Sequence, residues 1–314
     1  KRGWFWYYLE ESPLPARVSV EELPPCYPIY PSVRRSLLFR VLYYRRRISL
    51  AVPPALTDGT GALHFLCALV YEYLLLRYEG VFSDAFPAPP YDAAQFQLQV
   101  DSFQKYYEKP SNRFARLSPP AYQFRGERLP RRQLAVLEGR MPLDKALACA
   151  RERSATLTEL MTAVFLCAIH DGMRVRDRRK PVVVTVPVNL RNFFPSESAR
   201  NFFATINVGY DFSKGKDSLE SVLAEVKRSF QANLTQERMR EHMNRLCALE
   251  HSVPLRLVPL PLKDVILLAA NRLTARGVTA SFSNIGTVSM PKEMESLIHF
   301  FGAYTSAGKT QACA

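Results

Sequence analysis

The sequence lacks the patterns that mark metal-binding and disulfide-stapled proteins. Six cysteines are scattered over 314 residues, with no CxxC pair and with none of the five histidines at metal-ligand spacing. Cys67 and Cys167 fall inside apolar helical patterns, where a free thiol behaves as a small hydrophobic group. This usage predicts a reducing compartment and no metal site.

Long hydrophobic runs are equally scarce. The longest, Leu63–Leu76, contains Glu72, and we expect it to be too short to cross a bilayer. The start of the sequence, KRGWFWYYLEE, has only a short aromatic run before acids and prolines, so no secretory signal is expected. A cytoplasmic protein is therefore predicted, and peripheral contact with a membrane stays open.

The composition is that of a globular protein with an excess of positive charge. Apolar residues make up 47% of the chain and charged residues 23%, and the length is sufficient for two domains. The net charge of +13 favours an anionic partner, such as a phosphorylated cofactor, nucleic acid or an acidic membrane, or is simply a basic surface. No recognition motif accompanies the basic clusters at 40–47 and 174–180, so nucleic acid is not the expected partner.

The first half of the chain combines strand and helix patterns. Residues 37–53 alternate as in a β-hairpin with its turn at Arg45 and Arg46, and a helix is predicted from Ala62 to Arg77. The turn between them therefore joins a strand end to a helix start. The stretch 80–132 is rich in proline and aromatic residues and predicts long surface loops with short helices.

The second half is more regular. Thr156 and Glu159 form a capping-box pattern that opens a helix which Gly172 can close, and Asp217 with Glu220 is expected to cap another. The continuous apolar run 181–190 predicts a strand buried on both faces. Further patterns are a strand at 203–212, a helix at 262–273, and a strand and turn at 278–286. The fold class is therefore α/β or α+β, as two lobes at 1–135 and 136–314.

Three segments carry groups suited to chemistry. They are 54–61 (PALTDGTG), the end of a strand at Asn189 and Arg191, and the turn at Ser283 and Asn284. Each also has a structural explanation when taken alone: Asp58 as a helix cap, Asn189 and Arg191 as loop anchors, Ser283 and Asn284 as a local turn.

Taken in order, these segments resemble one family. KRGWFWYYLEE, RVLYYRRRISLAV, ALTDGTGALHFL, VPVNLRNFFPS, RNFFATINVGYDF and SNIG look like a bacterial alcohol-acetyltransferase-like family. That family belongs to the superfamily of chloramphenicol acetyltransferase, condensation domains and wax-ester synthases. The resemblance runs from about residue 1 to residue 300, and DGTG and VPVNLR are its most specific parts.

The resemblance implies a two-lobed acyltransferase, each lobe a mixed sheet with helices, with a tunnel between the lobes. Acyl-CoA (acetyl-CoA) or an acyl-carrier protein would be the donor, a small alcohol or amine the acceptor, and no cofactor would be bound permanently. In its HxxxDG signature the histidine is the general base and the aspartate orders the loop. Asp58 and Gly59 match the end of this signature. The residues implied around the reacting centre are Asn189, Arg191, Ser283 and Asn284.

Pro54 stands where the signature has its histidine, and no other HxxxD occurs in the chain. Proline cannot accept a proton, and it also fixes φ and removes an N–H. His64 lies nearly two turns further on and is not expected to substitute. Family members also begin earlier and continue after SNIG, so a truncated chain is expected. Two alternatives follow: a non-catalytic relative that binds CoA, a lipid or a carrier protein, and, more remotely, a basic nucleic-acid- or membrane-binding protein.

Overall fold

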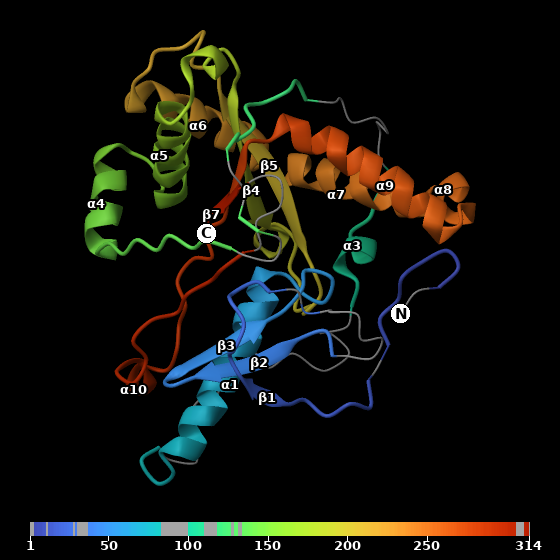
Figure 1. Ribbon diagram of the computed structural model, residues 1–314, viewed down its shortest axis with the longest axis vertical. Helices are drawn as coiled ribbons and strands as arrows, with labels where there is room; N and C mark the ends of the chain where they lie inside the picture. Colours follow the sequence, from blue (N-terminus) through green and yellow to red (C-terminus); the bar gives the residue numbers. More distant parts are fainter. Residues whose placement is uncertain are drawn as a thin grey trace.

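The computed structural model combines two mixed β-sheets with helices (Figure 1). The residues that it describes are 3–10, 12–27, 29, 37–82, 100–109, 118–126, 129–130, 134–305 and 311–313. The predicted α/β class with mixed sheets is therefore confirmed. Most of the predicted loop stretch 80–132 lies outside the described residues.

The first sheet has three strands in the order β1 (Val18–Val20), β2 (Arg40–Tyr44) and β3 (Arg47–Ala51). β1 runs parallel to β2, and β2 and β3 form the predicted antiparallel hairpin, with Tyr44 opposite Arg47. Arg45 takes a positive φ of 53° in the connecting turn. The two-residue loop requires this left-handed backbone, and arginine adopts it here in place of the usual glycine or asparagine.

Helix α1 (Gly59–Arg77) follows the hairpin and starts three residues before the predicted Ala62. The earlier start comes from Asp58, whose Oδ1 accepts a hydrogen bond from Gly61 N at 2.9 Å. The helix is 19 residues long with a mean hydropathy of 1.4, enough by length and composition to cross a membrane. The expectation that this segment is too short is therefore wrong, because the cap adds a turn to the apolar run.

The second sheet has the order β5 (Phe203–Tyr210), β4 (Val182–Asn189), β6 (Ala280–Phe282) and β7 (Gln311–Cys313). β4 is antiparallel to β5 and parallel to β6. Val182, Val184 and Val186 are buried, and the other residues of β4 are half-exposed. The prediction that this strand is buried on both faces is corrected, because only one face is fully covered.

Two long helices, α5 (Leu157–Asp171) and α6 (Leu219–Asn233), pack against β4 and β5 (Figure 1). The predicted capping box of Thr156 and Glu159 is confirmed, and Gly172 ends α5. The cap of α6 is Ser218, one residue after the predicted Asp217, because the Ser218 side chain accepts the hydrogen bond from Ser221 N. The main core lies between this sheet and these helices.

The remaining helices surround this centre. They are α3 (Ser102–Lys105), α4 (Leu143–Glu152), α7 (Gln236–His251), α8 (Val253–Leu257), α9 (Leu260–Thr274) and α10 (Lys292–Glu295). In Figure 1, α7, α8 and α9 lie together on the side of the sheet away from α4 and α5. The predicted 262–273 helix is α9, longer by two residues at its start and one at its end.

A second, smaller core joins α1 to the last part of the described chain. Cys67, Tyr71 and Leu74 of α1 pack in one cluster with Met290 and Met294. The first lobe thus draws part of its core from beyond residue 280, and the boundary at residue 135 stays a prediction.

Candidate functional site

Two of the three predicted segments meet in space. Asp58, at the start of α1, and Arg191, in the 3-10 turn Leu190–Asn192 after β4, form an ion pair with Nη1 and Oδ2 2.7 Å apart. Their side chains are 5% and 14% exposed, so the pair is largely removed from water. Removing two charges from water is costly unless further hydrogen bonds satisfy them.

Those further bonds are present on both sides of the pair. Asp58 Oδ2 also accepts from Phe202 N at 2.9 Å, while Oδ1 accepts from Gly61 N. The second guanidinium nitrogen of Arg191 donates to the carbonyl oxygens of Ser198 and Arg200, both at 2.8 Å. The ion pair therefore fixes the α1 turn and the loop between β4 and β5 against each other.

Asn189, the last residue of β4, supports this arrangement. Its Oδ1 accepts from Arg191 N at 3.0 Å and from Arg191 Nη1 at 3.3 Å. Its Nδ2 donates to Thr60 Oγ1 in the first turn of α1, at 3.4 Å. Asn189 thus orients the guanidinium and adds a second link to the α1 turn.

Position 54 lies at the exposed edge of the same junction. The carbonyl oxygen of Pro54 accepts a hydrogen bond from Asn201 Nδ2. Nearby, Thr57 Oγ1 donates to the carbonyl of Ala199 at 2.6 Å. Among the described residues, Asn201 Oδ1 is buried without a hydrogen-bond partner, so this amide is only half satisfied. Hydrogen bonds at Pro54, Thr57 and Asp58 therefore hold the 54–58 turn against the 198–202 loop.

The two glycines of the DGTG turn differ in what they require. A Cβ built on Gly61 would lie 2.1 Å from Thr57 Oγ1 and 3.0 Å from the carbonyl oxygen of Ala199. A Cβ on Gly59 would meet no atom within 4 Å. At position 61 there is therefore no room for a side chain, whereas a side chain at position 59 would extend into open space.

His64, on α1, shares the electrostatic environment of the ion pair. Burial of its ring lowers the pKa from the ordinary 6.5, and the charge of Arg191 lowers it further, against the opposing effects of Asp58 and Glu197. The side chain is half-buried.

The third predicted segment does not join this cluster. Asn284 Nδ2 donates to Thr158 Oγ1 at the start of α5, at 2.9 Å, and its Oδ1 accepts from Gly286 N, also at 2.9 Å. Gly286 takes a φ of 83°, which is typical of glycine in a turn. The local-turn alternative therefore describes Asn284. Within the described part of the chain, no hydrogen bond links Ser283 or Asn284 to Asp58, Asn189 or Arg191.

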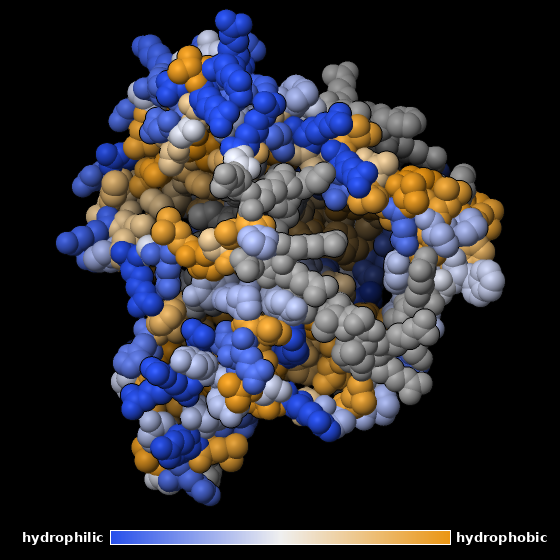
Figure 2. Space-filling model, in the orientation of Figure 1, coloured by the Kyte–Doolittle hydropathy of each residue, from blue (hydrophilic) through white to orange (hydrophobic). Residues whose placement is uncertain are grey.

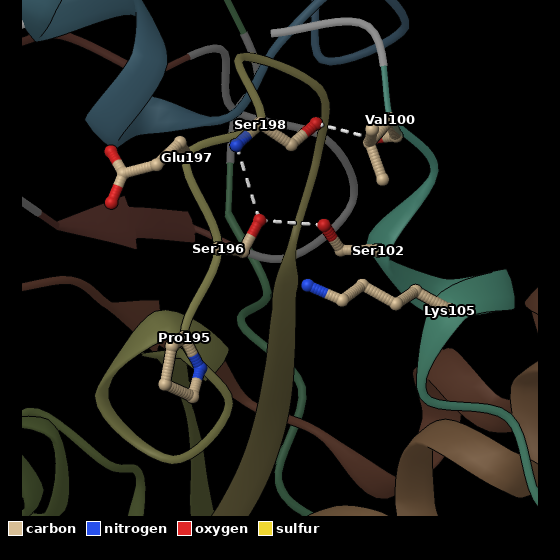
Figure 3. Close-up of a pocket in the computed structure, with 7 residues that line it drawn as sticks. All are labelled: Val100, Ser102, Lys105, Pro195, Ser196, Glu197 and Ser198. Carbon is tan, nitrogen blue, oxygen red and sulfur yellow. Dashed lines mark hydrogen bonds between the residues drawn. The ribbon is translucent and has the colours of Figure 1, made fainter. Parts of the chain in front are cut away.

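A pocket of about 170 Å³ opens beside the loop that Arg191 holds (Figure 3). The hydroxyls of Ser102 and Ser196 lie 2.6 Å apart, and Figure 3 shows the Lys105 amine pointing toward them. The Glu197 carboxylate points away from this group. Pockets for cofactor-sized ligands usually measure about 300–1,000 Å³. This pocket is smaller, and the tunnel between lobes stays a prediction.

No protein-family model and no curated protein matches the chain. Solved structures do match, at low identity. TRI101 of F. graminearum, complexed with coenzyme A and T-2 mycotoxin, is 10% identical over 80% of this chain and 55% of its own length, with a TM-score of 0.42. Polyketide synthase associated protein 5 from Mycobacterium tuberculosis is 14% identical over 79% of this chain and 60% of its own, with a TM-score of 0.42.

The first condensation domain of the CDA synthetase is 17% identical over 77% of this chain and 48% of its own, with a TM-score of 0.38. The chain thus spans between 48% and 60% of the length of these three structures. TM-scores this low establish neither a shared function nor a shared site.

Sequence reasoning missed the loop that supports the ion pair. Phe202, Ser198 and Arg200 contribute only backbone atoms to Asp58 and Arg191. Any residue type supplies such atoms, so no pattern of side chains marks them. Within the described ranges, no group of three or more histidine, cysteine or acidic side chains could hold a metal ion.

Proposed function

We propose that the chain is a CoA-dependent acyltransferase scaffold that transfers an acyl group to an alcohol or amine. The observation that carries the proposal is the buried ion pair between Asp58 and Arg191. The DGTG and VPVNLR segments, the most specific parts of the family resemblance, lie 133 residues apart and meet through this pair. A reacting centre at their junction is what the resemblance implies.

In this proposal Asp58 orders the turn and takes no proton. Both of its oxygens are occupied, by Gly61 N on one side and by Phe202 N and Arg191 on the other. These three hydrogen bonds occupy the carboxylate in holding the turn, which leaves it in a structural role. Asn189 and Arg191 keep the turn in place, and position 54 presents its side chain at the exposed edge.

The transfer needs a base that removes the proton from the acceptor hydroxyl as its oxygen attacks the acyl carbonyl. The thioester C–S bond then breaks, and the CoA thiolate leaves and takes up that proton. Pro54 has no atom that accepts a proton, so the general-base contribution of about 10²–10⁴-fold is absent at this position. The sequence does not favour His64 as a substitute base, because it lies nearly two turns past the signature. It is tested as the second candidate because its ring lies in the field of Asp58 and Arg191.

The test is thiol release from acetyl-CoA with a panel of alcohols and amines, for the parent and for Pro54→His. We expect Pro54→His to raise the rate by about 10²-fold or more. Ala55→His is the matched control, since it adds a histidine at the next exposed position of the same turn. Equal rates for parent, Pro54→His and Ala55→His would overturn the role of position 54.

His64→Gln, in the parent and in Pro54→His, separates the two candidate bases. If the parent shows activity that His64→Gln removes, the proton is taken by His64. If His64→Gln leaves the rate of Pro54→His unchanged, position 54 alone supplies the base.

The alternative is a non-catalytic relative that binds CoA, a lipid or an acyl-carrier protein, and Pro54 is the observation that favours it. Calorimetric titration with CoA distinguishes the two. Binding with no turnover in either the parent or Pro54→His supports the alternative. Absence of binding, with no turnover in either protein, contradicts both.

A further inference from the structure

Helix α9 exposes most of its apolar side chains to solvent. Leu262, Val265, Ile266 and Leu273 lie on one face by helical spacing and form a stripe, and Leu267 and Leu268 lie on the flanks. All six are between 43% and 62% exposed. The residues of α9 that are buried are Leu260 and Lys263, which lie toward the opposite face. A surface helix of a water-soluble protein usually has the reverse arrangement.

The inner face of α9 is held by the N-terminal aromatic arm, residues 4–7. Leu260 N donates to the carbonyl of Trp4 at 2.8 Å, and Lys263 Nζ donates to that of Phe5 at 2.8 Å. The same ammonium lies 3.6 Å from the centre of the Trp6 ring. These contacts fix the arm beside the exposed stripe, with Trp4 86% and Trp6 42% exposed.

Arm and helix together form one surface, which we call the Trp–α9 patch. Its members share large apolar side chains that are at least 42% exposed: Trp4, Phe5, Trp6, Val253, Leu257, Leu262, Val265, Ile266, Leu267, Leu268 and Leu273. Figure 2 shows a group of hydrophobic residues at the right-hand end of the molecule, where Figure 1 places α8 and α9, beside others elsewhere on this face. A contiguous exposed surface of this kind marks an interaction site.

The charges around the patch are mostly of one sign. Between residues 253 and 277, the exposed basic side chains are Arg256, Arg272 and Arg276, while Lys263 is buried against the arm, and the acidic side chain is Asp264. Asp264 accepts a hydrogen bond from Tyr7 OH at 3.0 Å, which ties it to the arm. The partner of this surface is therefore apolar where the stripe meets it and anionic at its edge.

We propose that the Trp–α9 patch binds the surface of an anionic lipid bilayer, with α9 lying along the headgroup boundary. Indole rings prefer that boundary, aliphatic side chains enter the acyl region, and arginines pair with anionic headgroups. A second copy of the chain fits less well, because it would bring the same basic edge against itself. The inference is independent of the proposed acyl transfer.

The protein contains its own probe for this contact, since its two tryptophans are Trp4 and Trp6. The experiment adds vesicles of phosphatidylcholine with 30% phosphatidylglycerol, or of phosphatidylcholine alone, to the full chain. We expect a blue shift of tryptophan emission, quenching by brominated acyl chains, and at least about tenfold stronger binding to the anionic vesicles at low salt. Added salt should weaken the binding.

Leu262→Asp places a charge in the stripe, and Leu137→Asp makes the same change at a fully exposed leucine in the segment before α4. We expect Leu262→Asp to weaken vesicle binding by about tenfold or more and Leu137→Asp to leave it unchanged. Both sites are exposed, so the circular dichroism spectrum should stay that of the parent. Absence of binding to either vesicle, equal effects of both substitutions, or self-association in sedimentation without vesicle binding would overturn the proposal.

Discussion

At the scale of single residues, the buried carboxylate of Asp58 makes the stability of the fold depend on its partner Arg191. Replacing Arg191 by methionine would leave the Asp58 carboxylate buried beside an apolar chain. Removing one partner of a buried ion pair costs about 3–5 kcal/mol, and we expect that loss in the free energy of unfolding measured with urea.

The matched control is Arg238→Met. Arg238 pairs with Glu241 at 3.4 Å, but both side chains are more than half exposed. Exposed pairs contribute about 0–1 kcal/mol, so this substitution should cost less than 1 kcal/mol. Equal losses for the two variants would contradict the assigned role of the Asp58 pair.

The DGTG turn offers a second comparison between single residues. Gly61→Ala would force a methyl group against Thr57 Oγ1, which is itself held by the Ala199 carbonyl, so we expect a loss of about 1–3 kcal/mol. Gly59→Ala meets open space in the first turn of α1 and should be neutral or stabilising by up to about 1 kcal/mol. Thermal unfolding of both variants measures the two effects. A larger loss of stability in Gly59→Ala than in Gly61→Ala would contradict the packing described for this turn.

At the scale of elements, α5 is the helix whose start is most sharply defined. Thr156→Ala removes the hydroxyl that accepts from Glu159 N at 3.2 Å, and it should cost about 1 kcal/mol of unfolding free energy. Thr274→Ala is the control, because its hydroxyl only bonds back to carbonyls in its own helix and alanine favours helix. A loss confined to Thr156→Ala is the expected result in urea titrations.

Elements with local signals were predictable from sequence. The hairpin turn at Arg45 and the box of Thr156 with Glu159 depend only on neighbouring residues, and the structure has them where expected. The cap of α6 was misplaced by one residue because Asp217 and Ser218 are both good cap residues, and only the backbone selects one.

The candidate site was predictable only in part. Asp58 and Arg191 could be named, but their contact joins distant segments and depends on how the second sheet meets α1. Asn284 stays a prediction, because an amide before a glycine suits a turn as well as a substrate oxygen.

At the scale of the whole molecule, two half-buried histidines set a pH dependence. Burial lowers the pKa of His64 and of His242 below the ordinary 6.5. The unfolded chain therefore binds more protons than the folded one between the lowered pKa values and 6.5. Stability should fall as the pH drops below about 6.5 and be fully present above it.

Urea unfolding from about pH 5 to pH 8 measures this slope. His64→Gln should flatten it in part, and His64→Gln with His242→Gln should flatten it further. A second loss at more acidic pH is expected from Asp211, whose pKa is lowered by its hydrogen bond from Ser213. An unchanged slope in the double variant would show that other groups titrate in this range.

The link between Asp58 and Arg191 also has a consequence for the order of folding. The two residues are separated by 133 positions, so their contact closes one of the longer loops in the chain. The turn that precedes α1 leaves the ribosome before Arg191, in the turn after β4, and before the 198–202 loop. The local bond from Gly61 N to Asp58 can therefore form first, whereas the bonds from Arg191 and Phe202 must wait for the second half of the chain to take its final shape.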